Sequence, residues 1–391
     1  MMVHYEAGEQ RIPVKMWLES VEEGAMKQAI NLANLPFAFK HIALMPDCHQ
    51  GYGMPIGGVL ATHGVVIPNA VGVDIGCGMC AVKTSLKNIE VGDLKKIMGE
   101  ARLRIPVGFE HRPQRCDESL MPSVPIITGL VIDGEYDSAR KQMGTLGGGN
   151  HFIEFQKDTS GFVWIMIHSG SRNLGKKVAD FYNTLAKFMN QKWHVSVPQE
   201  HDLAFLPEDT DEAQNYLSEM SYCVKFALAN RKKMMDDIQN IICEQLPKDA
   251  VEFEPMINIA HNYAAYEHHF GRNVIVHRKG ATLAREGTIG IIPGSQGTKS
   301  YIVKGLGNAD SFTSCSHGAG RKMGRGQACR TLSLEDEIRK LDEQGIIHGI
   351  RHEKDLDEAA GAYKDISEVM KNQSDLVSIV EELTPIAVIK G

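Results

Sequence analysis

Asp74 and Cys77 have the types and the spacing of metal-binding residues. They lie three positions apart in the glycine-rich segment 72–80, after an apolar run. A carboxylate and a thiolate held in one turn suit Zn²⁺, Mn²⁺ or Co²⁺ better than Mg²⁺ or Ca²⁺. The same segment is also typical of a β-turn with a buried free cysteine. Cys80 completes a Cys-x-x-Cys pair, but no second pair follows at zinc-ribbon spacing, which argues against a structural four-cysteine site.

A run of three glycines, 147–149, precedes Asn150, His151 and Glu154. Consecutive glycines let the backbone approach a ligand closely. Strand alternation places Asn150, Phe152 and Glu154 on one face of the following strand and His151 on the other, unless the glycines twist its start. The pattern indicates a ligand-binding turn, and a glycine-rich hairpin with a polar edge is the alternative.

His168 ends an apolar strand, and a helix is expected to begin just after it. Backbone N–H groups at the start of that helix, together with Arg172, would make an anion site. Residues 170–176 match G-x-x-x-x-G-K, but Lys177 follows where a P-loop needs Ser or Thr to hold Mg²⁺, which excludes a P-loop NTPase. A strand-end histidine with local hydrogen bonds is the alternative interpretation.

His317 lies between small residues, with 314–316 before it and 318–320 after it. Small neighbours leave an imidazole open to attack a large electrophile, and Arg321 and Arg325 add positive charge nearby. This pattern favours a histidine nucleophile that attacks phosphorus. The alternative is a basic loop that stays solvated.

The chain has 16 histidines, which offer many possible ligands and acid–base groups. His261 and Asn262 form a smaller cluster of the same kind as those above. His268 and His269, in contrast, are predicted on the surface of a helix.

The elements that must position these residues follow from hydrophobic periodicity. Helices are expected at 15–35, 89–104, 171–193, 212–247, 334–343 and 355–372. Strands are expected at 41–45, 57–62, 64–68, 70–75, 151–156, 162–168, within 273–305 and at 386–391, with 107–135 mostly loop. Helices and strands segregate, which favours an α+β fold over a doubly wound sheet. The absence of a sharp change in composition predicts one large domain, residues 1–391, with a helical insertion at about 175–250.

The composition bounds the class of protein. Of 391 residues, 43% are hydrophobic and 23% charged, which excludes a disordered chain or a coiled coil. We find no apolar run long enough to span a membrane and no signal peptide, so a cytoplasmic protein is expected. The net charge of −7 argues against nucleic-acid binding by bulk charge and leaves room for a local basic patch. The eight cysteines are not expected to form disulfides.

With these segments in view, the chain resembles the RtcB family of GTP- and Mn²⁺-dependent RNA ligases. The segments that carry the resemblance are 46–58, 70–79, 146–154, 167–175, 260–263, 293–305, 314–321, 362–366 and 388–391. Several of these strings, such as PGSQGTKSYIVKG and SCSHGAGR, are long and peculiar to the family. Residues 107–135 and 194–247 carry no family string that we recognise.

The resemblance implies roles for individual residues. The Mn²⁺ ligands would be Asp74, Cys77, His151, His168 and His261, with Cys77 bridging two ions. His317 would accept GMP as a phosphoramidate. The guanylate pocket would be lined by Asn150, His151, Phe152, Ile153, Glu154, His261, Asn262, Pro293, Gly294, Ser295, Gln296, Ser300, Gly318, Ala319, Gly320 and Lys390. The RNA phosphate would meet Arg172, Arg321 and Arg325.

The implied activity is the joining of RNA 3′-phosphate or 2′,3′-cyclic phosphate ends to 5′-hydroxyl ends, in tRNA splicing or RNA repair. GTP would guanylylate His317, and GMP would then pass to the RNA 3′-phosphate. The resemblance also implies that the protein acts as a monomer, without membrane contact, and with an archease-like activator. Two alternatives use the same metal site: a phosphoesterase without a transfer step, and an RNA-end-binding factor without turnover. The intact segment 316–320 argues against both, because neither needs an accessible nucleophilic histidine.

Overall fold

The computed structural model describes residues 1–123, 131–246 and 250–391. Its α-helices are α1 (Glu23–Ala33), α2 (Val91–Arg104), α3 (Ile132–Gln142), α4 (Arg172–Lys192), α5 (Asp211–Gln245), α6 (Arg325–Thr331), α7 (Leu334–Glu343) and α8 (Ile366–Asn372). Its strands are β1 (Met2–His4), β2 (Val14–Met16), β3 (Ala38–His49), β4 (Ile56–Thr62), β5 (Val65–Val66), β6 (Gly78–Lys83), β7 (Phe152–Asp158), β8 (Val163–Ser169), β9 (Leu206–Pro207), β10 (Ile257–Ala260), β11 (Asn262–His269), β12 (Arg272–Lys279), β13 (Ala281–Leu283), β14 (Ile289–Ile292), β15 (Ser300–Gly305), β16 (Ser314–Ser316) and β17 (Val377–Lys390).

Two large sheets contain most of these strands. In the described residues, one sheet has the order β1-β2-β3-β4-β12-β11 and the other the order β10-β6-β8-β7-β17-β15-β14. Neighbouring strands are antiparallel in every pair of these two sheets except β2 with β3. Each sheet takes strands from distant parts of the chain, as when β17 inserts between β7 and β15. The expected α+β fold with antiparallel sheets is confirmed.

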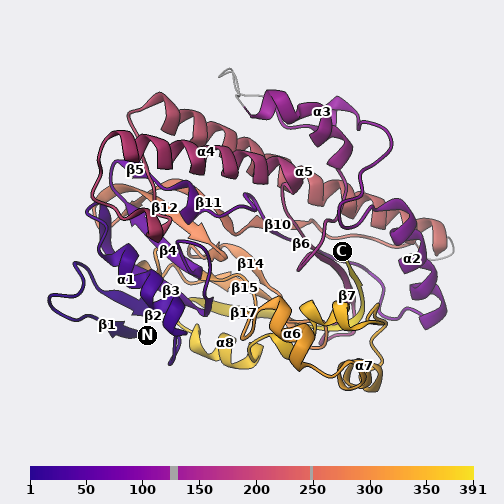
Figure 1. Cartoon of the computed structure of the whole chain (residues 1–391). Coiled ribbons are helices and arrows are strands. Elements are labelled where there is room, and N and C mark those ends of the chain that lie inside the picture. Colours follow the sequence, from indigo (N-terminus) through magenta and orange to yellow (C-terminus); the bar gives the residue numbers. More distant parts are fainter. Residues whose placement is uncertain (124–130, 247–249) are drawn as a thin grey trace.

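Helices α4 and α5 lie side by side across one side of the sheets (Figure 1). Thr210 caps α5 by accepting a hydrogen bond from the Ala213 N–H, and apolar residues at helical spacing are buried along it. α5 contacts β6, β8 and β10, so the helices expected as an insertion form part of the core. The expected helix at 212–247 is confirmed through Gln245, and residue 247 lies outside the described residues.

Arg231, buried on α5, connects this helix to the strands that carry the candidate site. Its guanidinium donates hydrogen bonds to the backbone oxygens of Gly76 (3.1 Å), Ser169 (2.7 Å) and Ile259 (3.1 Å). A buried guanidinium is stable only when its donors are satisfied. One side chain therefore holds the start of β6, the end of β8 and strand β10 in place.

Three of the predicted helices and strands differ from those in the structure. The helix at 15–35 is confined to α1, because Val14–Met16 pair instead with β3 as a parallel strand. The strand at 70–75 is a 3₁₀ turn followed by a loop, in which Gly72 has a φ of +92° that a strand does not allow. The helix at 355–372 is α-helical only in α8, and 3₁₀ turns precede it.

The two neighbouring histidines expected on a helix surface lie in a strand. His268 and His269 end β11, and His269 is buried with its Nε2 at 2.9 Å from Glu267 Oε2. The expected loop at 107–135 holds for the described residues up to 123, where only a 3₁₀ turn at Glu118–Leu120 forms. The expected end of this loop, residue 135, is wrong because helix α3 begins at Ile132. Residues 124–130 lie outside the described part of the chain.

Candidate active site

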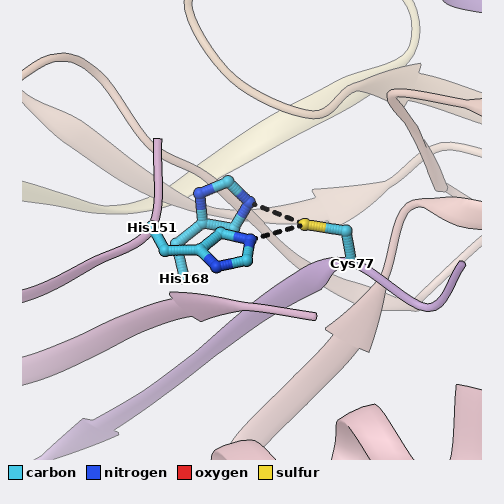
Figure 2. Close-up of side chains that lie close together, drawn as sticks. All are labelled: Cys77, His151 and His168. Atoms are coloured by element: carbon cyan, nitrogen blue, oxygen red, sulfur yellow. Dashed lines mark hydrogen bonds between the residues drawn. The ribbon is translucent and has the colours of Figure 1, made fainter. Parts of the chain in front are cut away.

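Cys77, His151 and His168 form a compact cluster of possible metal ligands. Cys77 Sγ lies 3.5 Å from His151 Nε2 and 3.3 Å from His168 Nε2, and all three ligand atoms lie within 4.8 Å of one another. Figure 2 shows both imidazole rings directed toward the sulfur. The cluster forms because β8 lies between β6 and β7, so the end of one strand meets the starts of the other two.

The backbone orients both imidazole rings. His151 Nδ1 lies 3.0 Å from Leu146 O, and His168 Nδ1 lies 3.0 Å from Asn150 O. A carbonyl at Nδ1 fixes the proton there, which leaves the Nε2 lone pair free to bind a metal. One thiolate, two imidazoles and the adjacent Asp74 carboxylate form a mixed set of soft and hard donors that suits Zn²⁺, Co²⁺ or Mn²⁺, so the residues present fit the metal expected from the sequence.

Burial keeps these groups neutral. It lowers the pKa of His168 and of His261 well below the ordinary value for histidine. Burial, with the charge of Asp74 next in importance, raises the pKa of the Cys77 thiol well above its ordinary value. A cation that binds here would have to displace the thiol proton, whereas the imidazoles of His168 and His261 are already in their neutral ligand form.

Asp74 and His261 extend the cluster. Asp74 Oδ2 lies 3.2 Å from His151 Nε2. The ring of His261 lies 5.3 Å from that of His168 and 4.9 Å from that of His317, measured between ring centres. His261 Nδ1 is buried and has no hydrogen-bond partner among the described residues. The five expected metal ligands are therefore neighbours, and His261 lies between the cluster and His317.

His317 follows the short strand β16, and its orientation depends on a carboxylate. Its Nδ1 lies 2.6 Å from Asp47 Oδ2, and the same oxygen accepts the backbone N–H groups of His317 (3.0 Å) and Gly318 (3.3 Å). Burial would raise the pKa of Asp47, but the charge of His317 and hydrogen bonds from it outweigh this effect, and the pKa lies below its ordinary value. An ionised Asp47 fixes the Nδ1 proton and leaves Nε2 as the free nitrogen of the ring.

Sequence reasoning assigned no role to Asp47, although the residue lies in one of the family strings. It is completely buried in β3, within the otherwise apolar run before His49. A buried carboxylate needs a partner, so an aspartate in an apolar strand is itself a signal of an interaction. The sequence did not reveal that the partner is 270 positions away.

The cluster and His317 share one cavity of about 1020 Å³. Most of the expected site residues line it: Asp74, Cys77, Asn150, His151, Phe152, Glu154, His168, His261, Asn262, Pro293, Gly294, Ser295, Gln296, His317, Gly318, Ala319, Gly320, Arg321, Arg325 and Lys390. Glu358 and Tyr363 also line the cavity and had not been expected there by residue.

Three of the expected site residues lie behind the cavity wall. Ile153 packs in the core on the other face of β7. Ser300 Oγ accepts hydrogen bonds from the Gly294 N–H (3.1 Å) and from Gln156 Nε2 (3.0 Å), so it supports the loop that lines the cavity. The third, Arg172, does not line the cavity and is bound to neighbouring loop residues.

Glu154, which is buried, and Lys390, which is half-buried, are ionisable groups on neighbouring strands that both line the cavity. Burial raises the pKa of Glu154 to about 8, although a hydrogen bond from Gln156 and the charge of Lys390 oppose this. Burial likewise lowers the pKa of Lys390, against the charges of Glu358 and Glu154. A polar ligand that satisfies both groups would recover part of the cost of burying them.

The three arginines expected at RNA phosphate differ in how free they are. Arg172 donates to Thr145 Oγ1 (3.1 Å) and to Gly108 O (2.8 Å), so it supports a loop. Arg321 forms an ion pair of 2.9 Å with Glu358 and is largely buried. Arg325 pairs with the same carboxylate at 2.7 Å, but 54% of its side chain stays exposed.

The amino-acid sequence is similar to those of a known family and of several of its members. The family described as tRNA-splicing ligase RtcB matches residues 28–124 and 128–391. The RNA-splicing ligase RtcB of Escherichia coli strain K12 is 41% identical over 97% of this chain and 97% of its own. The tRNA-splicing ligases RtcB of Nanoarchaeum equitans and Thermococcus kodakarensis are 32% and 31% identical; the matches cover 98% and 95% of this chain, and 96% and 92% of theirs. With the metal-binding cluster and the histidine loop brought into one cavity, these matches show that the chain belongs to the RtcB family.

Proposed function

We propose that the protein is an RNA ligase that joins RNA 3′-phosphate or 2′,3′-cyclic phosphate ends to 5′-hydroxyl ends, with GTP as co-substrate. The main support is the position of His317. Its Nδ1 is held by Asp47, and its ring lies 4.9 Å from His261 at the edge of the Cys77–His151–His168 cluster. The names of the relatives support ligation of RNA, and the covalent chemistry is our inference.

In the first step, His317 Nε2 attacks the α-phosphorus of GTP. A P–N bond forms, the bond from the α-phosphorus to the bridging oxygen breaks, and pyrophosphate leaves. The imidazole gains positive charge as the bond forms, and the ionised Asp47 at Nδ1 stabilises that charge. Small residues on both sides, including Gly318, leave space for the nucleotide.

Asp74, Cys77, His151, His168 and His261 would hold the two Mn²⁺ ions. Bound there, the ions would neutralise negative charge on the phosphoryl oxygens. The protein's own contribution is to present neutral Nε2 atoms of His151 and His168, fixed by the carbonyls of Leu146 and Asn150.

The guanine base would lie between the buried Glu154 and the half-buried Lys390, two groups that a base with donors and acceptors can satisfy. In the second step, an oxygen of the RNA 3′-phosphate attacks the same phosphorus, and His317 leaves as a neutral imidazole. In the third, the 5′-hydroxyl oxygen attacks the RNA phosphate and GMP leaves. A 2′,3′-cyclic phosphate would first be hydrolysed to the 3′-phosphate.

Labelling with α-³²P-GTP and Mn²⁺ tests the covalent step. The wild-type chain should retain label, and His317→Ala should lose it, because the imidazole that forms the P–N bond is then absent. His194→Ala, at an exposed histidine just after α4, is the matched control and should label like wild type. Label retained in His317→Ala would reject the nucleophile. An unlabelled wild type that still hydrolyses RNA cyclic phosphates would favour the phosphoesterase alternative.

The proposal extends to the biological role, the location and the partners of the protein. We infer a role in tRNA splicing or RNA repair, in the cytoplasm, as a monomer assisted by an archease-like activator; these points rest on family resemblance. Among the described residues, none of the helices combines the length and apolar content that crossing a bilayer requires.

A further inference from the structure

Phe109 has the most exposed large apolar side chain in the part of the chain that the structure describes, with a fractional exposure of 102%. Single exposed apolar side chains are common, so exposure alone does not indicate a ligand. The backbone beneath this ring is fixed, however. The Gly108 N–H donates to Gly147 O and Arg172 Nη2 donates to Gly108 O, both at 2.8 Å. The ring is therefore presented to solvent on a constrained backbone.

This turn packs against the wall of the active-site cavity. Gly148 lines the cavity, and a Cβ placed on it would lie 3.5 Å from Gly108 Cα. A Cβ on the next residue, Gly149, would lie 2.6 Å from an Arg325 guanidinium nitrogen. The turn that carries Phe109 and the half-exposed Arg325 thus both pack against the same short stretch of cavity wall.

Tyr52 is a second exposed aromatic residue, and it belongs to the cavity wall itself. It lines the cavity and has a fractional exposure of 79%. Its carbonyl accepts hydrogen bonds from Lys279 Nζ (2.6 Å) and from the Met54 N–H (2.7 Å). Gly53, with a φ of +67°, turns the chain directly after it. As at Phe109, a fixed glycine-flanked turn presents the ring.

The cavity is larger than a guanylate alone requires. Its volume of about 1020 Å³ is at the upper end of sites for small molecules, which span roughly 300–1,000 Å³. If the proposed function is correct, an RNA end reaches His317 from solvent, and the nucleotides beside it pass the rim of the cavity.

We propose that Phe109 and Tyr52 stack on unpaired nucleobases next to the RNA ends that are joined. Stacking uses the π-face that every base has, so it suits an enzyme that must accept ends of different sequence. Arg325 supplies positive charge for a backbone phosphate on the same stretch of wall. This inference rests on the proposed function, and RNA binding tests it without turnover.

The test compares Phe109→Ala and Tyr52→Ala with Phe109→Trp, which keeps a stacking ring. Phe188→Ala, at a 60% exposed phenylalanine of α4, is the matched control. The probe is a short single-stranded RNA with a 3′-phosphate, with 2-aminopurine at its last bases, added with Mn²⁺. Each alanine variant should bind about 5- to 100-fold more weakly and lose quenching of the 2-aminopurine. Phe109→Trp and Phe188→Ala should bind like wild type.

Labelling by GTP needs no RNA and shows whether each variant keeps an intact site. Equal RNA affinity in Phe109→Ala, Tyr52→Ala and Phe188→Ala would overturn the stacking role. The stacking role would also be overturned if the alanine variants lost as much affinity for an RNA whose last nucleotides are abasic as for the intact RNA, because an abasic end has no base to stack. Failure of the wild type to label or ligate would instead reject the proposed function, whatever its RNA affinity.

Discussion

The proposed active site has two halves, one for the metal and one for the nucleophile, and their side chains are oriented in different ways. On the metal side, backbone carbonyls of Leu146 and Asn150 orient the imidazoles of His151 and His168. On the nucleophile side, the side chain of Asp47 orients His317. A substitution cannot remove a backbone carbonyl, whereas it can remove a carboxylate. The orientation of the proposed nucleophile therefore depends on one replaceable group, and that of the two proposed imidazole ligands does not.

Of the substitutions that compare the two halves, Asp47→Asn should have the largest effect. It should slow the reaction of His317 and leave metal binding unchanged. The amide has nearly the same shape but cannot stabilise a positive imidazole, so guanylylation of His317 should slow by about 10²- to 10⁴-fold. Binding of Mn²⁺, measured by titration calorimetry, should stay within about twofold of wild type. A matching loss of metal binding would show that the halves are not independent.

Cys77→Ala should have a smaller but still large effect, on the other half. Removing a ligand should weaken Mn²⁺ binding by at least about 100-fold, since loss of a group that only supports a ligand already costs 10- to 100-fold. Cys80→Ala is the matched control, because this buried thiol of β6 contacts Arg231 O and does not line the cavity. Elemental analysis that finds equal metal in both variants would reject Cys77 as a ligand.

Glu154→Gln should have the smallest effect, and it depends on pH. The pKa of Glu154 in the folded chain, about 8, lies above its ordinary value of 4.5. The neutral carboxyl therefore contributes stability that is fully present below pH 4.5 and is lost as the pH rises through 8. The glutamine variant should match wild type at low pH and become more stable by up to a few kcal/mol at pH 9, at roughly 1.4 kcal/mol per pKa unit. Urea unfolding at several pH values measures this, and a gap that does not change with pH would contradict it.

Much of the site could be predicted because its residues lie in local patterns. His168 ends an apolar strand and His317 lies among small residues, and both signals are visible in short segments. Alternation alone placed His151 on the face opposite Asn150 and Glu154, yet all three line the cavity. The reason is the glycine run, in which Gly147 and Gly149 have φ values of +97° and +71° and the strand begins only after His151.

What could not be predicted depends on contacts between distant segments. The hydrogen bond between His317 and Asp47 joins a loop after β16 to β3, and no local spacing reveals it. Lys15 and Met16 of strand β2 fell within the expected helix 15–35, because the periodicity of so short a strand is ambiguous until its partner β3 is known. The long helix α5, whose apolar residues repeat over many turns, was predictable almost to its ends.

The position of β17 makes the order of synthesis matter. This strand separates β7 from β15 in the middle of its sheet and brings Lys390 into the cavity beside Glu154. A nascent chain that has grown as far as His261 already contains all five expected metal ligands, but the sheet beside β7 is still open. The protein should therefore acquire the means to capture a cation well before it can hold a nucleotide, and a chain cut before β17 should bind metal without becoming guanylylated.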